Sequence, residues 1–241
     1  MSHVYQDNYY DYIDGGSIRS ARAVIPTARR YVNINSVLDV GCGRGAWLKG
    51  WVESGIDDFV GVDGDYVQVD KLPFSPDHFH AVDLVKRFDL GRTFDLVQCL
   101  EVAEHVPAYA ADILVDSIVG HGNSVLFSAA VPGQGGEFHV NEQGIDFWVQ
   151  KFEARGFTGW DVIRPALRDV RSIEPWYRYN SVLFTRVRPA EVEDCDRFPA
   201  SGYRVPITWR LRNSVIGMLP YPVVGRLARA KHAAMRTMRA L

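Results

Sequence analysis

The chain has 241 residues, of which 47% are hydrophobic and 23% are charged. These values are ordinary for a globular protein, and the length suits one α/β domain with an extension. The 27 basic and 29 acidic residues give a net charge of −2, which excludes a chain that binds polyanions through its overall charge.

The cysteines and the apolar stretches exclude several further classes. Cys42, Cys99 and Cys195 are far apart and form no CxxC pair, so neither a disulfide framework nor a thiolate zinc site is indicated. The N-terminus lacks a basic segment followed by an apolar one, which is the pattern of a secretory signal. Residues 215–224 are apolar but too few to span a bilayer, and they include two prolines. The sequence therefore predicts a reduced, cytoplasmic compartment.

In chain order, apolar runs of strand length alternate with longer amphipathic segments, which is typical of a parallel sheet with helical crossovers. The predicted strands are residues 36–40, 59–62, 80–82, 94–100, 124–129, 160–163 and 181–187. The predicted helices are residues 46–54, 108–119 and 142–155. A long loop between the last two strands would let one of them run antiparallel. Its residues 176–179, with the sequence WYRY, could border an acceptor pocket.

Three regions follow from this pattern. Residues 1–35 form an N-terminal arm and helix that covers the site, residues 36–188 form the catalytic domain, and residues 189–241 form a linker and a basic C-terminal extension. From residue 204 onward the chain has eight Lys or Arg and no Asp or Glu, which leaves 19 basic and 29 acidic residues elsewhere.

The end of the extension, residues 223–241, has the apolar spacing of an amphipathic helix. Such a helix could dock on the acidic body, form a homodimer or lie on an anionic membrane surface. RNA is a further option, but the absence of any sequence resembling an RNA-binding module argues against nucleic acid as a partner.

A glycine loop links the first predicted strand to the first predicted helix. Glycines let the backbone approach a ligand, and Gly41, Gly43 and Ala46 also fit the dinucleotide pattern G-x-G-x-x-G/A. Asp39 separates the two interpretations, because a carboxylate there would repel a pyrophosphate but suits the ammonium of a methionyl group. Asp63 closes the second strand and could accept both hydroxyls of a ribose, and Asp83 follows the third strand, where it could meet an adenine amino group.

The run VLDVGCGRG, followed in order by GVDGD, AVDL and FDLVQCLEVAEHV, resembles the class I S-adenosylmethionine-dependent methyltransferases over residues 37–187. The resemblance implies a Rossmann-like fold with a mostly parallel seven-stranded sheet and helices on both faces. It also implies S-adenosylmethionine as cofactor. The residues that it assigns to the cofactor are Asp39, Gly41, Cys42, Gly43, Asp63, Gly64, Asp83, Leu84, Leu100 and Glu101.

The motif Glu101-Val-Ala-Glu104-His105 follows the fourth strand, and His139 lies in a glycine-rich loop after the fifth. Carboxylates and imidazoles together form a hard ligand set that suits Mg²⁺, Mn²⁺ or Fe²⁺. The motif with a later histidine resembles both the metal-dependent 2′-O-methyltransferases of small RNAs and the ubiquinone-pathway O-methyltransferases. The first resemblance implies Glu101, Glu104, His105 and His139 as metal ligands. Alternatively, Glu101 contacts the cofactor, Glu104 and His105 cap the next helix, and the enzyme needs no metal.

These observations predict an O-methyltransferase that acts on a hydroxyl of a small-molecule or sugar-containing acceptor, with Mg²⁺ or Mn²⁺ as a second cofactor. His139, His105 and Glu104 are the candidate catalytic residues, and His139 could serve as a general base. A metal-independent N- or C-methyltransferase is the main alternative. A nicotinamide-dependent oxidoreductase is disfavoured by Asp39, and a binding protein that kept the cofactor fold without catalysis stays open.

Overall fold

The computed structural model describes residues 7–201, 203–220 and 223–226, with side chains from residue 15 onward. Its centre is a seven-stranded sheet with the order β3-β2-β1-β4-β5-β7-β6. The strands are β1 (Ser36–Val40), β2 (Asp58–Asp63), β3 (Phe79–Ala81), β4 (Leu96–Leu100), β5 (Ser124–Ser128), β6 (Thr158–Trp160) and β7 (Val182–Thr185). All neighbouring strands pair in parallel except β7, which runs antiparallel to both β5 and β6. The predicted sheet is confirmed.

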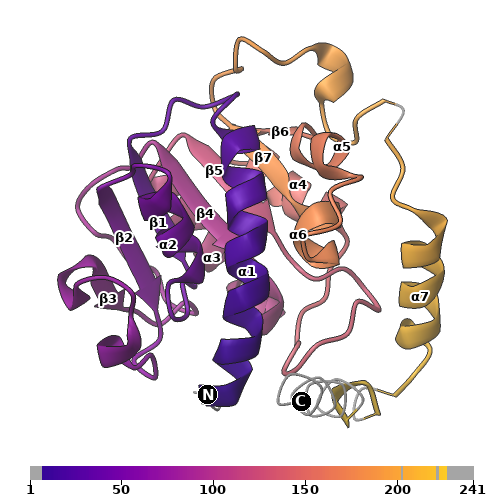
Figure 1. The fold of residues 1–241 in the computed structure, drawn as a ribbon. Helices are drawn as coiled ribbons and strands as arrows, with labels where there is room; N and C mark the ends of the chain where they lie inside the picture. Colours follow the sequence, from indigo (N-terminus) through magenta and orange to yellow (C-terminus); the bar gives the residue numbers. More distant parts are fainter. Residues whose placement is uncertain (1–6, 202, 221–222, 227–241) are drawn as a thin grey trace.

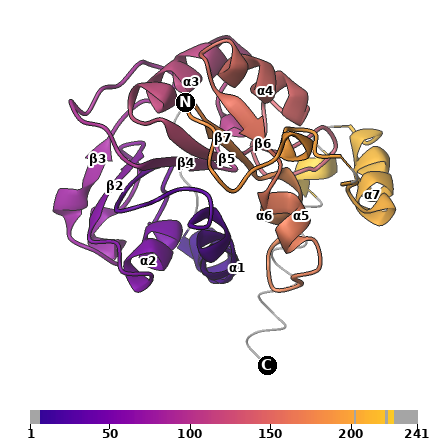
Figure 2. The same ribbon diagram turned by 90° about the horizontal axis from the view of Figure 1, so that it is seen from above.

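Helices cover both faces of the sheet (Figures 1 and 2). One face carries α1 (Asp7–Ala28), α2 (Ala46–Glu53), α5 (Ile163–Leu167) and α6 (Pro175–Asn180), and the other carries α3 (Ala111–Gly120) and α4 (Ile145–Glu153). Short 3₁₀ helices lie at Val69–Lys71, Pro76–His78, Ala103–His105, Ala108–Ala110 and Asp194–Asp196.

The two hydrophobic clusters of the core follow from the alternation of side chains along each strand. In β4, Leu96 and Leu100 pack into the cluster under α1 and α2, whereas Val97 and Cys99 pack into the cluster under α3 and α4. Strands that are buried on both faces need nearly continuous apolar sequences, and such sequences are the basis on which these strands were predicted.

The parallel strands place their carboxyl ends along one edge of the sheet. Strand order reverses between β1 and β4, which are neighbours in the sheet but are separated in the chain by β2 and β3. In open α/β sheets, a crevice for ligands lies at this switch point. The loops that follow β1, β2 and β4 therefore meet where the sequence motifs predicted the site.

Two local predictions were wrong between residues 160 and 180. The strand expected at 160–163 ends at Trp160, and Ile163 begins α5 because Ile163 and Leu167 bury their side chains under the sheet. Residues 175–180 form α6 instead of a loop, with Pro175 in the first turn, where its fixed backbone angle favours a helix. The helix expected from residue 142 begins only at Ile145.

The C-terminal extension adds α7 (Ile207–Gly217), which stands beside the loop that follows β5 (Figure 1). Large apolar side chains of α7 and of the residue that caps its C-terminus are exposed, with 59–82% of their surface accessible: Ile207, Leu211, Val215 and Met218. Most of the amphipathic helix predicted for residues 223–241 lies outside the described residues. Within the described part of the chain, every helix is too short or too polar to cross a membrane.

Candidate active site

The glycine loop is held tightly between β2 and the segment after β4. The backbone N–H groups of Gly41 and Cys42 both donate to the carbonyl of Val62, at 2.8 and 3.1 Å. Gly41 has φ +79°, and a Cβ atom there would lie 2.4 Å from the side chain of Val102. Only glycine fits such a position, so the loop turns sharply and keeps its backbone at the crevice.

Asp39 is a buried carboxyl group at the centre of this edge, with only 4% of its surface exposed. Burial raises its pKa to about 7, the polar side chain of Gln98 nearby partly opposes this rise, and the charge of Asp63 adds to it. A carboxylate whose ionisation is costly gains strongly from a cationic ligand. The site thus suits the methionyl ammonium expected from the sequence.

Asp63 ends β2 and is already engaged on both carboxylate oxygens. It accepts hydrogen bonds from the backbone N–H groups of Gly43 and Gly64, each at 2.7 Å, and from the hydroxyl of Tyr66. Burial raises the pKa of Asp63, and these three hydrogen bonds offset part of the rise. A ribose would share the carboxylate with Tyr66, a residue that the motif did not reveal.

Asp83 and Leu84 lie at the rim, after β3. Asp83 is exposed; it accepts a hydrogen bond from the Val85 N–H and pairs with Lys86 at 3.3 Å. Leu84 is half-buried and packs against the core cluster under α3 and α4. Their contact with adenine stays a prediction.

Glu101 follows the buried Leu100 and adopts a left-handed backbone conformation, with φ +56°. Such strain in a non-glycine residue is concentrated at functional sites. Its carboxylate accepts hydrogen bonds from the side-chain amides of Gln134, at 2.6 Å, and Asn180, at 3.5 Å. Asn180 also donates to the Gln134 side chain at 2.7 Å. Three segments distant in sequence are therefore joined beside the cofactor loop.

Glu104, His105 and His139 form a compact cluster. Ligand atoms from the three side chains all lie within 4.8 Å of one another. Glu104 is 1% exposed, and its Oε2 has no hydrogen-bond partner among the described residues. Burial raises its pKa well above the usual value, and the charges of Glu101 and Glu142 raise it further.

The structure divides the four predicted metal ligands into two groups. Glu101 lies outside the cluster, because its carboxylate is turned to Gln134 and Asn180. Neither the 3₁₀ helix at Ala108–Ala110 nor α3 has a side-chain cap, so no hydrogen bond supports the capping alternative for Glu104 and His105. Three of the four predicted metal ligands are therefore brought together.

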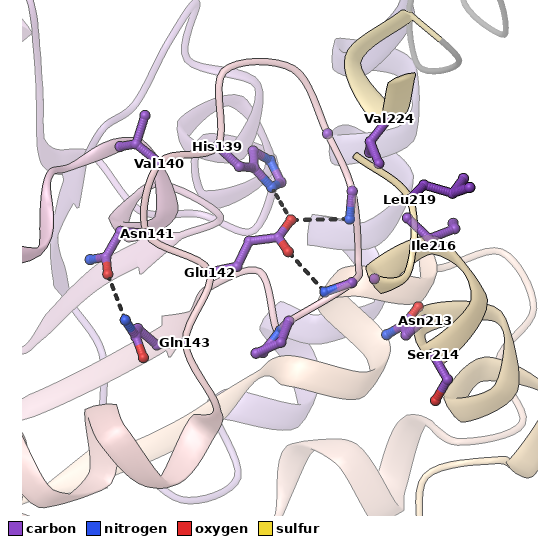
Figure 3. A pocket seen from close by; sticks show the side chains of 15 residues that line it. His139, Val140, Asn141, Glu142, Gln143, Asn213, Ser214, Ile216, Leu219 and Val224 are labelled. Carbon is purple, nitrogen blue, oxygen red and sulfur yellow. Dashed lines mark hydrogen bonds and ion pairs between the residues drawn. The ribbon is translucent and has the colours of Figure 1, made fainter. Parts of the chain in front are cut away.

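Glu142 orients His139 and was missed as a site residue, because it was assigned to the following helix (Figure 3). Its Oε1 lies 2.8 Å from His139 Nδ1, and the carboxylate also accepts the backbone N–H groups of Gly133 and Gly135. A proton on Nδ1 leaves the lone pair on Nε2, which lies 4.0 Å from Glu104. A carboxylate behind an imidazole in this way is a common support for a metal-binding histidine.

Comparison with known proteins addresses the domain and the fold. A family model for a methyltransferase domain matches residues 18–119. No curated protein matches the chain. Among solved structures, an amino pentose methyltransferase of calicheamicin biosynthesis from Micromonospora echinaspora, with S-adenosylmethionine bound, is 18% identical with a TM-score of 0.56. That match covers 78% of this chain and 100% of the other.

Two further structures have the same fold. A sugar N-methyltransferase from Streptoalloteichus sp ATCC 53650 is 18% identical with a TM-score of 0.59, covering 77% of this chain and 97% of the other. Magnesium protoporphyrin IX methyltransferase from Synechocystis PCC 6803 is 18% identical with a TM-score of 0.51, covering 78% and 90%. The match to the domain model and the sheet order favour a methyltransferase over the oxidoreductase alternative. Residues 18–119 match a methyltransferase domain, and the chain has the fold of methyltransferases of known structure.

Proposed function

We propose that the protein transfers the methyl group of S-adenosylmethionine to a hydroxyl of a small-molecule or sugar-containing acceptor, assisted by one divalent cation. The observation that carries this proposal is the buried Glu104, whose Oε2 has no partner among the described residues and whose carboxylate groups with His105 and His139 within 4.8 Å. A buried carboxylate is costly unless a positive charge or hydrogen bonds compensate it.

The residues of the cluster fit such a cation. Glu104, His105 and His139 would hold it, with one carboxylate and two imidazoles as ligands. His105 Nδ1 lies 3.3 Å from the carbonyl of Phe138, and His139 Nδ1 lies 2.8 Å from Glu142. Donation from each Nδ1 keeps the Nε2 lone pair available. Mg²⁺ and Mn²⁺ accept this mixed set, although imidazole favours Mn²⁺.

The protein's own groups divide the work of methyl transfer. The acceptor oxygen attacks the methyl carbon, the sulfur–methyl bond breaks, and the hydroxyl releases its proton to solvent. S-adenosylhomocysteine, a methyl ether and a proton are formed. Asp39 and the glycine loop hold the cofactor, and Glu101 lies beside it, fixed by Gln134 and Asn180. A bound cation would lower the pKa of the acceptor hydroxyl. Positioning the two reactants in line supplies much of the rate.

Direct cation binding tests the proposal without knowledge of the acceptor. Mn²⁺ titrated into the full chain should bind in an electron paramagnetic resonance assay, and E104Q should weaken that binding by about 100-fold or more, since a direct ligand matters at least as much as its supporting residues. E191Q, which changes an exposed carboxylate in the linker, is the control. If the parent binds no Mn²⁺, or if E104Q binds it as tightly, the metal assignment is wrong and a metal-independent methyltransferase takes its place.

A further inference from the structure

A cavity of about 510 Å³ lies between the glycine-rich loop after β5 and the C-terminal helix α7 (Figure 3). The loop contributes His139, Glu142 and the backbone of its glycines, while α7 contributes Asn213, Ser214 and Ile216. The volume is within the range of small-molecule sites, which is about 300–1,000 Å³.

The wall formed by α7 is packed against the loop by specific contacts. Arg212 donates from its guanidinium to the carbonyl of Gln134 at 2.9 Å, and Asn213 is buried. A Cβ atom on Gly133 would lie 2.1 Å from the carbonyl oxygen of Asn213, so the backbone of α7 approaches closely only because residue 133 is glycine. The helix is therefore docked as part of the site.

The same loop connects the cavity to the reaction centre. His139 lines the cavity and belongs to the cluster with Glu104. Gln134, whose carbonyl binds α7, reaches Glu101 with its side-chain amide at 2.6 Å. A molecule in the cavity would thus lie against the proposed cation site.

The chemistry of the walls indicates the kind of molecule that fits. The described residues that line the cavity include no Lys or Arg, so apart from the proposed cation a phosphate or carboxylate would find no cationic side chain there. Glu142 is already saturated by His139 and two backbone N–H groups. Polar groups of Gln143, Asn213 and Ser214 line one part, and Ile216, Leu219 and Val224 line another.

We propose that this cavity is the acceptor site, that α7 selects the acceptor, and that the acceptor is an uncharged, hydroxyl-bearing molecule with an apolar substituent, such as a glycoside of a hydrophobic group. The inference rests on the proposed function, because it places the acceptor hydroxyl beside the cluster of Glu104, His105 and His139. It adds the substrate class and a role for the C-terminal extension.

Two neighbouring residues of α7 provide a matched pair of variants. Ile216 lines the cavity, whereas Val215 is 62% exposed and is not part of its lining. The probes are uncharged phenyl glycosides of common hexoses and pentoses, and glucose 6-phosphate is the charged comparison. Their binding to the full chain, in the presence of S-adenosylhomocysteine, is measured by saturation-transfer NMR and calorimetry. At least one phenyl glycoside should bind the parent and V215W equally, and bind I216W at least tenfold more weakly.

Several results would overturn the inference: no phenyl glycoside binds the parent, glucose 6-phosphate binds more tightly than all of them, or I216W and V215W bind alike. S-adenosylhomocysteine affinity shows whether I216W is folded. If it is not, I216A replaces it and should weaken glycoside binding several-fold through lost apolar contact. Mn²⁺ titration of the same proteins separates the two proposals. If no Mn²⁺ binds, the cation site is rejected, but glycoside binding that depends on Ile216 would still support the cavity as the acceptor site.

Discussion

The cofactor side and the acceptor side of this molecule are built in different ways. On the cofactor side, Asp63 binds Gly43 and Gly64, so its contacts link residues at most 20 positions apart. On the proposed acceptor side, Arg212 binds Gln134 across 78 positions, and at the border between the two sides Asn180 binds Glu101 across 79. The first side can be recognised from short motifs, whereas the second exists only once the chain has folded.

If the two sides are independent, a substitution on one side should leave the affinity for the ligand of the other side unchanged. The largest such effect is expected for E142Q, which removes the charged partner of His139 Nδ1 without changing the volume of the side chain. Loss of a supporting carboxylate typically costs 10–100-fold in metal affinity, so Mn²⁺ binding should weaken by about that factor. S-adenosylmethionine affinity, measured by calorimetry, should stay unchanged.

The exposed Asp146 in the first turn of α4 offers a control carboxylate four residues away. D146N should behave as the parent in both assays. A loss of cofactor affinity in E142Q as large as its loss of Mn²⁺ affinity would show that the two sides are coupled.

The reciprocal change is D39N, which removes the buried charge on the cofactor side. Hydrogen bonds to charged groups contribute about 2 kcal/mol, so S-adenosylmethionine should bind roughly 30-fold more weakly. Mn²⁺ binding to the Glu104 cluster should change less than twofold. Equal cofactor affinity in D39N and the parent would reject Asp39 as the partner of the ammonium.

A smaller effect is expected from pH, because burial raises the pKa of Asp39 to about 7 in the ligand-free protein. Below that pH the carboxyl group must lose its proton before it can pair with an ammonium. Affinity for S-adenosylmethionine should therefore fall by up to about tenfold per pH unit below 7 and level off above it. Calorimetry between pH 5.5 and 8.5 measures the slope, and D39N should be much flatter.

The same pKa has a consequence for stability with a definite sign. The folded protein holds this proton more tightly than the unfolded chain, whose pKa is near 3.8, so the contribution of Asp39 to the free energy of unfolding falls as the pH rises toward 7. Ligand-free D39N should therefore have a higher Tm than the parent at pH 8, with a smaller difference at pH 5. A lower Tm for D39N at pH 8 would contradict the burial argument.

The fold could be predicted largely because buried parallel strands require nearly continuous apolar runs, as in β1 and β4, each interrupted by one polar residue. The cofactor loop could be predicted because Gly41 and Asp39 meet local requirements of backbone angle and charge. The short helices α5 and α6 could not, since five or six residues carry too little periodicity and their positions depend on packing against the sheet.

The remainder of the site depends on tertiary contacts. Glu104, His105 and His139 could be selected by residue type, but the exclusion of Glu101 from the cluster follows from its bonds to Gln134 and Asn180. The contact between Glu142 and His139 could not be predicted from their spacing of three residues, because the same spacing is common between neighbouring side chains of a helix. The docking of α7 on Gly133 left no recognisable pattern in the sequence.

The antiparallel direction of β7 determines on which side of the sheet the chain enters and leaves this strand. Val182, at the start of β7, pairs with Phe127 near the end of β5, and Thr185 pairs with Ser124 at its beginning. The chain thus enters β7 on the reactive side, which brings Asn180 there, and leaves on the opposite side with the sheet already complete. The described part of the segment after β7 leads to α7, which packs on the loop after β5 as an addition to a finished sheet. New acceptor walls could therefore evolve by replacing one terminal segment, without rearranging strand order or altering the loop that holds the cofactor.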